Sequence, residues 1–494
     1  MQRLNGVLLH PTSFPGRYGI GEFNEHAYRF VDFLADTGQK LWQVLPLGPT
    51  GYGDSPYQCF SAFAGNPLLI NLDQLVSENS LAAQDLANAP SFPADRVDYG
   101  PVIEFKYAVL RRSLAYFRQH ATPEQEADFW SFCERNAAWL DDYALFMALK
   151  DAHGGAVWNT WERDIARHEP QALAARRDKL HTRVQTYQYL QYQFFKQWSA
   201  LKRYANDKGI RIVGDIPIFV AYDSADAWAH REQFYFDEDG NLLVIAGVPP
   251  DYFSPTGQRW GNPLYRWDVM QQQCFAWWIE RCRAAFGLCD FVRIDHFRGF
   301  EAYWEVPASE PTAIHGRWVQ APGYELFRAI ERALGKLAII AEDLGIITPE
   351  VEALRDTFGF PGMRVLQFAF VADTKSTYLP HNYIPNCVAY SGTHDNNTTV
   401  GWFRSLDAPT RAQVLCYTGT DGSCIHWDMI RLLMMSVAGM TIVTMQDLMG
   451  LDANSRMNLP GRPDGNWGWR YTPAMLTDEI RAQLAEMTAA YGRC

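Results

Sequence analysis

The sequence predicts an α/β fold, and within that class a (β/α)8 TIM barrel, on three observations. Short apolar runs that end in a polar residue recur along the whole chain. Several of these runs follow a helical pattern that is closed by glycine. The composition, with 48% hydrophobic and 20% charged residues over 494 positions, is that of a globular protein with a large core. Repeated helix, glycine and buried strand is typical of a parallel sheet covered by helices on both faces.

Eight runs have the length and composition of strands that are buried on both faces. In order they are GVLLH (6–10), LWQVLPL (41–47), IRIVGD (210–215), FVRID (291–295), LAIIAE (337–342), RVLQF (364–368), VAYSGTHD (388–395) and TIVTMQD (441–447). Eight strands favour a closed barrel. A doubly wound open sheet is the alternative, but the chain has no GxGxxG turn that would favour its dinucleotide-binding form.

Helical patterns lead into four of the runs, and a glycine follows each pattern. The patterns cover 273–286, 324–334, 349–358 and 427–438, and the glycines are Gly287, Gly335, Gly359 and Gly439. Glycine ends helices because it adopts the left-handed conformation without steric cost. These segments therefore read as the crossover helices of the barrel.

The spacing between the runs predicts two insertions. Residues 48–209 are too many for one crossover helix, and they contain helical patterns at 102–118, 124–140 and 182–206. We expect an inserted, mainly helical subdomain at about 48–181, with the last helix as the crossover to the third strand. A second insertion, at about 216–272, contains a long aromatic segment rich in glycine and proline, 246–265, which we expect to be a functional loop over the site. Residues 1–494 would form a single catalytic barrel with these insertions.

Charge and cysteine content exclude several classes of protein. The 44 Lys and Arg against 56 Asp and Glu give a formal charge of −12, which disfavours nucleic acid and anionic membranes as partners. The chain opens without a signal-peptide pattern, and its longest uncharged run, 432–446, is too short to span a bilayer. Nine scattered cysteines without a CxxC pair indicate reduced thiols. We expect a cytoplasmic monomer or weak homo-oligomer.

Carboxylates gather where barrel proteins carry their chemistry, at the carboxyl ends of the strands. The runs place Asp215, Asp295, Glu342, Asp395 and Asp447 there, with His296 and His394 beside two of them. Aspartates that cap βα loops would account for one or two such residues. Five carboxylates close together repel one another, so we expect that a reaction requires them there.

Two kinds of chemistry use converging carboxylates. A metal site takes oxygen and imidazole ligands, but the chain has no HxH or HExxH pattern. Retaining glycosyl transfer needs one carboxylate as nucleophile and one carboxylic acid as proton donor. Arg293 lies two residues before Asp295, so both side chains share a strand face, where the cation would keep Asp295 ionised. The aromatic content of 14% also suits a groove for sugars.

Seven segments carry a resemblance to a known family. RIDHFRG (293–299), AEDLGIITPEV (341–351) and SGTHDNNTTVGWF (391–403) resemble the signature segments of the 4-α-glucanotransferases, the amylomaltase or disproportionating-enzyme family related to the α-amylases. SPYQCFSAFAGNPLLI (55–70), GDIPIFV (214–220), GQRWGNPLY (257–265) and RMNLPG (456–461) also resemble family segments, in the same order. The resemblance covers essentially the whole chain and is to the short form of the family.

The resemblance implies transfer of a 1,4-α-glucan segment to the 4-hydroxyl of glucose or a malto-oligosaccharide, through a covalent glucosyl-enzyme intermediate and without metal or cofactor. Asp295 matches the nucleophile, Glu342 the general acid and base, and Asp395 the third carboxylate, which binds sugar hydroxyls. Substrate-binding positions are matched by Tyr57, Asp215, Asp251, Tyr252, Phe253, Gln258, Trp260, Arg293, His296, His394 and Asn458. The implied partners are α-1,4-glucans, maltose and malto-oligosaccharides.

Three other functions remain open from the residues alone. An α-amylase-like hydrolase would share the three carboxylates, a non-catalytic glucan-binding protein would be expected to lose the nucleophile or the acid, and a metal-dependent sugar isomerase would need a compact ligand set. Two positions depart from the family pattern. Asn397 stands where many members have Asp, and Glu162 stands where Pro is frequent.

Overall fold

A closed parallel barrel lies at the centre of the computed structural model, which describes residues 3–250, 254–371 and 375–493. Its strands are β1 (Leu4–Leu8), β2 (Leu41–Gln43), β3 (Arg211–Pro217), β6 (Phe291–Asp295), β9 (Ile339–Ala341), β10 (Gly362–Val365), β11 (Cys387–Tyr390) and β12 (Met440–Thr444). They are joined in the order β1-β12-β11-β10-β9-β6-β3-β2, and β1 pairs with β2 to close the ring. Each of the eight apolar runs overlaps one barrel strand, and the predicted (β/α)8 barrel is confirmed.

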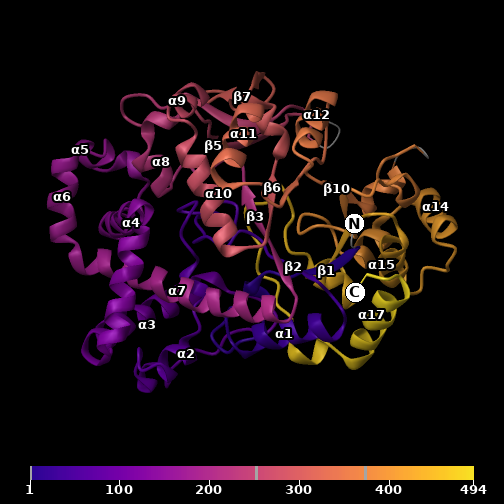
Figure 1. Ribbon diagram of the computed structural model, residues 1–494, viewed down its shortest axis with the longest axis horizontal. Helices are drawn as coiled ribbons and strands as arrows, with labels where there is room; N and C mark the ends of the chain where they lie inside the picture. The colour runs from indigo at the N-terminus through magenta and orange to yellow at the C-terminus, as the bar shows by residue number, and fades with distance from the viewer. Residues whose placement is uncertain (1–2, 251–253, 372–374, 494) are drawn as a thin grey trace.

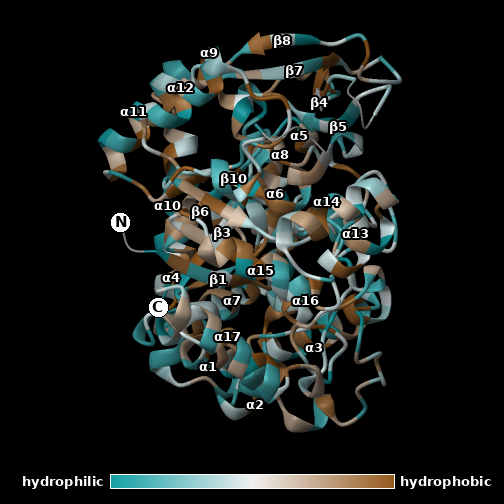
Figure 2. Cartoon of the chain, turned by 90° about the vertical axis from the view of Figure 1, so that its right-hand side faces the viewer, coloured by the Kyte–Doolittle hydropathy of each residue, from teal (hydrophilic) through white to brown (hydrophobic). Residues whose placement is uncertain are grey.

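Helices surround the barrel and connect most of its strands (Figure 1). The crossover helices are α1 (Glu25–Asp36), α7 (His181–Asp207), α10 (Ala276–Leu288), α11 (Gly323–Leu334), α12 (Pro349–Thr357) and, between β11 and β12, α13 (Thr399–Ser405), α14 (Ala408–Thr418) and α15 (Ile425–Met435). Between β10 and β11 the described residues form 3₁₀ turns at Leu366–Val371 and Pro380–Asn382. After β12 come α16 (Met445–Leu448) and α17 (Asp478–Ala490). In Figure 2 the apolar strands lie inside this more polar shell.

Two predicted helix boundaries differ from the structure for local reasons. Helix α10 begins at Ala276 because Cys274 and Phe275 both have positive φ, at 54° and 57°. The same helix continues through Gly287, so this glycine does not end it. Helix α15 ends at Met435, where the hydroxyl of Ser436 donates to the carbonyl of Leu433 at 2.7 Å. Polar side chains at helix ends satisfy backbone groups that lack a partner within the helix.

The connection from β2 to β3 is mainly helical and forms one side of the molecule in Figure 1. Its helices are α2 (Leu72–Ser77), α3 (Tyr99–His120), α4 (Pro123–Ala152), α5 (Arg163–Ala166), α6 (Pro170–Lys179) and α7, which leads into β3. Aromatic pairs join α4 to α7, including Phe132 with Tyr192 and Trp139 with Phe195. The indole of Trp198 in α7 donates to the carbonyl of Leu288 at 3.0 Å, which fastens the insertion to the barrel.

A small antiparallel sheet lies above one end of the barrel (Figure 2). Its order is β5-β4-β7-β8, with β4 (Val244–Val248), β5 (Gln258–Pro263), β7 (Ala302–Pro307) and β8 (Arg317–Gln320). Helices α8 (Ala225–Ala229) and α9 (Trp267–Gln272) complete the connection from β3 to β6. The segment 246–265, expected as a loop, therefore contains parts of two paired strands. Its glycines and prolines hid the strand pattern, and β5 begins with two exposed polar residues, Gln258 and Arg259, so it is not a continuous apolar run.

The two ends of the chain meet beside β1 (Figure 1). The guanidinium of Arg3 donates to the carbonyls of Tyr491, at 2.8 Å, and of Met434, at 2.6 Å. The buried side chain of Arg493 donates to the carbonyl of Leu4 at 3.3 Å. These contacts hold the C-terminal helix against the first barrel strand. Among the helices of the described residues, none combines the length and the hydropathy that crossing a bilayer requires.

The close contact between β1 and β2 generates a stability prediction. A Cβ atom on Gly6 would lie 2.2 Å from the carbonyl oxygen of Leu41, which is backbone and cannot rotate away. We expect Gly6→Ala to destabilise the protein by about 1–3 kcal/mol, the usual cost of overpacking a core. Gly100→Ala is the matched control, because a Cβ there meets nothing within 4 Å. Thermal melting of both variants checks this, and equal melting temperatures would contradict the assigned packing.

Candidate active site

An arginine between two aspartates occupies the interior of the barrel. Asp215 on β3 and Arg293 on β6 are register partners on adjacent strands, and Asp295 lies two residues further along β6 on the same face. Arg293 Nη1 donates to both oxygens of Asp215, at 2.8 and 2.7 Å, and Nη2 donates to Asp295 Oδ1 at 2.8 Å. The intervening Val292 and Ile294 face the helices and are buried. Strand alternation therefore builds this cluster directly from the sequence.

The three charged groups differ in their exposure. The side chain of Asp215 is 0% exposed and that of Arg293 is 4% exposed, whereas Asp295 keeps 33% of its side-chain surface open. Burial raises the pKa of Asp215 to about 6, although the Arg293 charge opposes the shift. Burial would lower the pKa of Arg293, but the charges of Asp215 and Asp295 outweigh it and raise that pKa well above its ordinary value. Asp295 is thus the more exposed end of this cluster.

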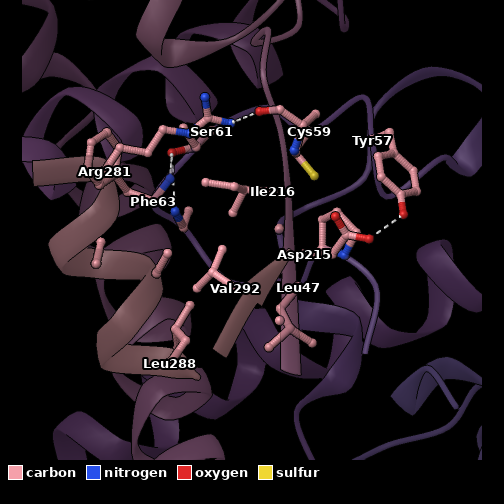
Figure 3. Close-up of a pocket in the computed structure, with 18 of the residues that line it drawn as sticks. Leu47, Tyr57, Cys59, Ser61, Phe63, Asp215, Ile216, Arg281, Leu288 and Val292 are labelled. Atoms are coloured by element: carbon pink, nitrogen blue, oxygen red, sulfur yellow. Dashed lines mark hydrogen bonds between the residues drawn. The ribbon is translucent and has the colours of Figure 1, made fainter. Parts of the chain in front are cut away.

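Tyr57, from the loop after β2, extends the cluster. Its hydroxyl donates to Asp215 Oδ2 at 2.8 Å, as Figure 3 shows. Its ring stacks on the imidazole of His394, with centroids 5.0 Å apart and planes 19° apart. Trp467 packs against both rings, at 5.9 Å from Tyr57 and 5.8 Å from His394. These three rings form one wall of the candidate site.

A small apolar cavity of about 70 Å³ lies beside strand β3 (Figure 3). Ile216, Leu288 and Val292 line it together with Phe63, while the carboxylate of Asp215 turns toward Tyr57. Successive residues of a strand point to opposite faces. One strand therefore separates the charged interior from an apolar layer beneath α10.

Glu342 follows β9 directly and lies beside the end of β6. Its Oε2 accepts the backbone N–H of His296 at 2.7 Å, and its Oε1 accepts that of Leu344 at 2.9 Å. His296 has φ 52° and ψ 48°, the left-handed conformation. Burial and then the charge of Asp295 raise the pKa of Glu342 to about 8, against the opposing effects of Arg293 and the two N–H donors. Glu342 thus holds a proton at neutral pH.

Asp395, after β11, has the opposite environment. Burial would raise its pKa, but His394, a hydrogen bond from Asn458 and the charge of Arg293 outweigh it and lower the pKa to about 2. Asn458 Nδ2 donates to Asp395 Oδ1 at 2.6 Å, and His394 Nε2 lies 3.3 Å from Oδ2. The side chain remains 45% exposed. Asp395 is therefore an ionised and accessible acceptor of hydrogen bonds.

Two other carboxylates near the strand ends have structural contacts. Asp447 accepts the hydroxyl of Ser391 and the backbone N–H of Thr399, both at 2.6 Å, and it is buried. Of the five carboxylates at the ends of the runs, this one joins two loops by hydrogen bonds. Asp343, next to Glu342, pairs with Arg355 at 2.5 Å on the other side of the strand.

The second sheet adds Trp260 from β5. Its ring meets the imidazole of His296 edge-on, with centroids 4.7 Å apart, and its Nε1 donates to Gln258 Oε1 at 3.1 Å. Burial lowers the pKa of His296 to about 4, so this imidazole is neutral, and its buried Nε2 has no partner. Asp251, Tyr252 and Phe253, which were also expected at the site, lie outside the described residues.

Sequence reasoning did not select Arg456 and Trp467. Arg456 donates through Nη2 to the carbonyl of Asp395 and through Nε, at 2.6 Å, to that of Asn458. It thereby holds the 456–461 segment against the end of β11. Arg456 could have been selected from the sequence, because it lies two residues before the candidate Asn458. Trp467 lies in a coil with no sequence pattern that points to the site. In the described part of the chain, no cluster of three His, Cys, Asp or Glu side chains is arranged to hold a metal ion.

The geometry brings together Glu342, whose pKa is raised, Asp295, which is paired with Arg293, and Asp395, whose side chain is partly exposed. The pair of Asp295 and Glu342 suits covalent catalysis with proton transfer, in which one group attacks while the other protonates a leaving oxygen. Aromatic rings and neutral hydrogen-bonding groups around the three suit a ligand that carries many hydroxyls.

Sequence comparisons give a consistent relationship. A family model described as 4-alpha-glucanotransferase matches residues 9–477. The chain is 52% identical to the 4-alpha-glucanotransferase of Synechocystis sp., over all of this chain and 98% of the relative. It is 51% identical to the enzyme of the same name from Thermus thermophilus, over all of this chain and 99% of that relative.

Solved structures agree with these matches. The amylomaltase from Streptococcus agalactiae, in complex with acarbose, superposes with a TM-score of 0.97 at 43% identity, over 100% of both chains. The amylomaltase from Corynebacterium glutamicum superposes with a TM-score of 0.81 at 20% identity, over 98% of this chain and 75% of the other. At 20% identity, the similarity to the second structure shows a shared fold.

The buried ion pair generates a prediction about stability. Arg293→Met leaves the carboxylate of Asp215 buried without its cation, and we expect a loss of about 3–5 kcal/mol, as for other broken buried pairs. The double variant with Asp215→Asn removes the charge as well and should recover a large part of that loss. Urea-unfolding midpoints of the two single variants and the double variant measure the coupling. Strictly additive losses would contradict it.

Proposed function

This chain belongs to the 4-alpha-glucanotransferase family, and from that premise we propose that Asp295, Glu342 and Asp395 carry out the transfer. The enzyme is a 4-α-glucanotransferase, and glucan transfer is favoured over hydrolysis. The observation that carries the assignment of roles is the contrast between two neighbouring carboxyls. Glu342 has a pKa raised to about 8, whereas Asp295 is paired with the fixed cation Arg293.

The first step breaks the glycosidic bond of an α-1,4-glucan donor. Glu342 donates its proton to the glycosidic oxygen while the carboxylate of Asp295 attacks the anomeric carbon. The bond between anomeric carbon and oxygen breaks, the shortened glucan leaves with the proton, and a glucosyl ester forms on Asp295. Burial still raises the pKa of Glu342, but ester formation removes the negative charge of Asp295, which had raised it further. Glu342 is thereby prepared to remain ionised and to act as a base.

The second step transfers the glucosyl group to an acceptor. The 4-hydroxyl of an incoming glucose or malto-oligosaccharide loses its proton to Glu342 and attacks the same anomeric carbon. Asp295 is released as a carboxylate. Two inversions give net retention of the α configuration.

The remaining groups hold the sugar at the reacting centre. Asp395, kept ionised beside His394 and Asn458, accepts hydrogen bonds from ring hydroxyls and stabilises positive charge as it develops on the sugar. The unpartnered Nε2 of His296 is available to another hydroxyl. Tyr57 and Trp260 offer aromatic faces, and Asp215 and Arg293 fix the position of Asp295. Gln258 and residues 251–253 complete the proposed set of substrate contacts.

The preference for a sugar acceptor over water rests on exclusion of water from the ester. Closely packed rings near the site, among them Trp260 and Trp467, support this reading. A protein that only bound glucan would not need a carboxyl group with a raised pKa beside a carboxylate that is paired with a fixed cation. Action on maltose and malto-oligosaccharides in the cytoplasm, as a monomer or weak homo-oligomer, remains our prediction from the sequence.

Incubation with maltotriose alone tests the activity. We expect glucose together with maltotetraose, maltopentaose and longer chains, because each donor segment passes to another sugar. Chromatography of the products over time measures the distribution. Glucose and maltose as the sole products would show that water is the acceptor and would overturn the proposed acceptor chemistry.

The acid role of Glu342 makes its own prediction. Glu342→Gln should lower turnover of maltotriose by about 10²–10⁴-fold, the range for loss of a general acid. The same variant should still release fluoride from α-glucosyl fluoride, because that leaving group needs little protonation. Steady-state rates and the burst of fluoride measure the two cases. An equal loss on both donors would contradict the assignment.

The pH dependence provides the control. Glu342 is active when protonated, so kcat/KM for maltotriose should fall as the pH rises through about 8. The decrease in kcat/KM at high pH should be smaller for α-glucosyl fluoride, because fluoride leaves without needing the proton. An equal decrease in kcat/KM for both donors would show that a group other than the general acid causes it.

A further inference from the structure

Trp467 has an unusual backbone conformation for a large residue. Its φ is 64°, in the left-handed region, although the residue is only 6% exposed. Glycine adopts this region freely, whereas a bulky side chain there is strained against its own backbone. Such strain persists only where the surroundings fix the residue, and it gathers at functional sites. The strain at Trp467 therefore indicates a residue whose position matters to the site.

Two segments that are distant in the sequence hold Trp467 in this conformation. Its backbone N–H donates to the carbonyl of Met457 at 2.8 Å. Its own carbonyl accepts the hydroxyl of Tyr99, in helix α3 of the insertion, at 3.1 Å. The next residue is held as well, since the N–H of Val97 donates to the carbonyl of Gly468 at 2.7 Å. The helical insertion therefore fixes a residue that packs against the active site.

The indole of Trp467 packs against two rings that each contact a carboxylate. Its centroid lies 5.8 Å from the imidazole of His394 and 5.9 Å from the ring of Tyr57, within the range of favourable aromatic pairs. His394 Nε2 lies 3.3 Å from Asp395 Oδ2. The hydroxyl of Tyr57 donates to Asp215, as Figure 3 shows. A ring that packs on both members of this stack restrains the atoms with which they face the two carboxylates.

The contact between His394 and Asp395 matters for both groups. Burial would lower the pKa of His394, but the charge of Asp395 outweighs it and raises that pKa. Burial would raise the pKa of Asp395, and His394 is foremost among the groups that lower it instead. Because His394 is only 4% exposed, the rings packed around it set the orientation of its imidazole. Loss of the indole would leave a cavity into which the imidazole can tilt, away from Asp395.

We propose that Trp467 is a positioning residue for the transfer reaction, because its fixed indole keeps His394 against Asp395. The proposal rests on the proposed function, which gives Asp395 its role at the sugar. Trp467 acts through His394 and need not touch the substrate itself. Tyr99 lies one step further out, since its hydroxyl fixes the carbonyl of Trp467. A residue of the helical insertion is thereby linked to the third carboxylate through Trp467 and His394.

Three variants test this chain of contacts. Trp467→Phe keeps an aromatic ring and Trp467→Leu removes it, whereas Tyr99→Phe removes only the hydroxyl that binds the carbonyl of Trp467. Tyr222→Phe is the matched control, because the hydroxyl of Tyr222 also donates to a backbone carbonyl, that of Gly240, at 2.7 Å. Its ring packs against Trp158 in the insertion. Urea unfolding measures the folded fraction of each variant, so that kcat can be given per folded molecule.

The expected loss is in kcat and not in KM. Trp467→Leu should lower kcat for maltotriose about tenfold and leave KM within about threefold, because a displacement of a reacting group by about 1 Å can cost about 100-fold in rate. Trp467→Phe should recover most of kcat. Tyr99→Phe should lower kcat about two- to threefold, with Tyr222→Phe unchanged. A raised KM with unchanged kcat would instead assign Trp467 to substrate binding and overturn the proposal.

A double-variant cycle shows whether the effect passes through His394. In a His394→Ala background, Trp467→Leu and Tyr99→Phe should each change kcat by less than about twofold, because the group that they position is absent. A purely structural role would give the same fold-loss in both backgrounds, and that result would overturn the proposal, as would full kcat in Trp467→Leu. Failure of the proposed function would appear separately, as no transfer from maltotriose by the unaltered enzyme.

Discussion

The buried guanidinium of Arg293, placed between Asp215 and Asp295, is the interaction on which the active site depends. Without it, two carboxylates on adjacent strands would face each other in the barrel interior and repel. With it, one carboxylate is anchored and the other is directed toward the open end of the strand. Burial of this ion pair costs desolvation free energy. Its main contribution is therefore to place Asp295 and to supply a fixed charge, and not only to stabilise the fold. The raised pKa of Glu342 follows first from burial and then from the charge of Asp295, which the same arrangement holds close by.

Strand register decides which acidic residue reaches the site. Glu342 and Asp343 are adjacent in the sequence, yet one lies beside Asp295 and the other pairs with Arg355 behind the strand. A slip of one residue would exchange their faces. The left-handed backbone at His296 then turns its N–H toward Glu342, an arrangement that strand geometry alone does not supply. Precise placement therefore combines a regular sheet with one irregular residue at its end.

Strand periodicity made the barrel and its strand-end carboxylates predictable, because buried parallel strands leave a strong pattern in the sequence. The pattern did not separate Asp447 from the other carboxylates. A carboxylate that joins two loops and one that faces the candidate site have the same sequence pattern at a strand end. The strands β4 and β5 were hidden by glycine and proline. Contacts that depend on long loops, such as Trp467 against Tyr57, leave no local pattern, because residues far apart in the chain meet only after folding.

The pairing of β1 with both β2 and β12 has a consequence for how the protein is made. Residues 4–8 leave the ribosome long before one of their two neighbours, residues 440–444. Over that interval the first strand presents an unpaired edge, which is a template for wrong pairing. Asn458 and Trp467 follow later still. A nascent chain thus contains Asp295 and Glu342 long before it contains the residues that close the barrel and complete the proposed sugar site.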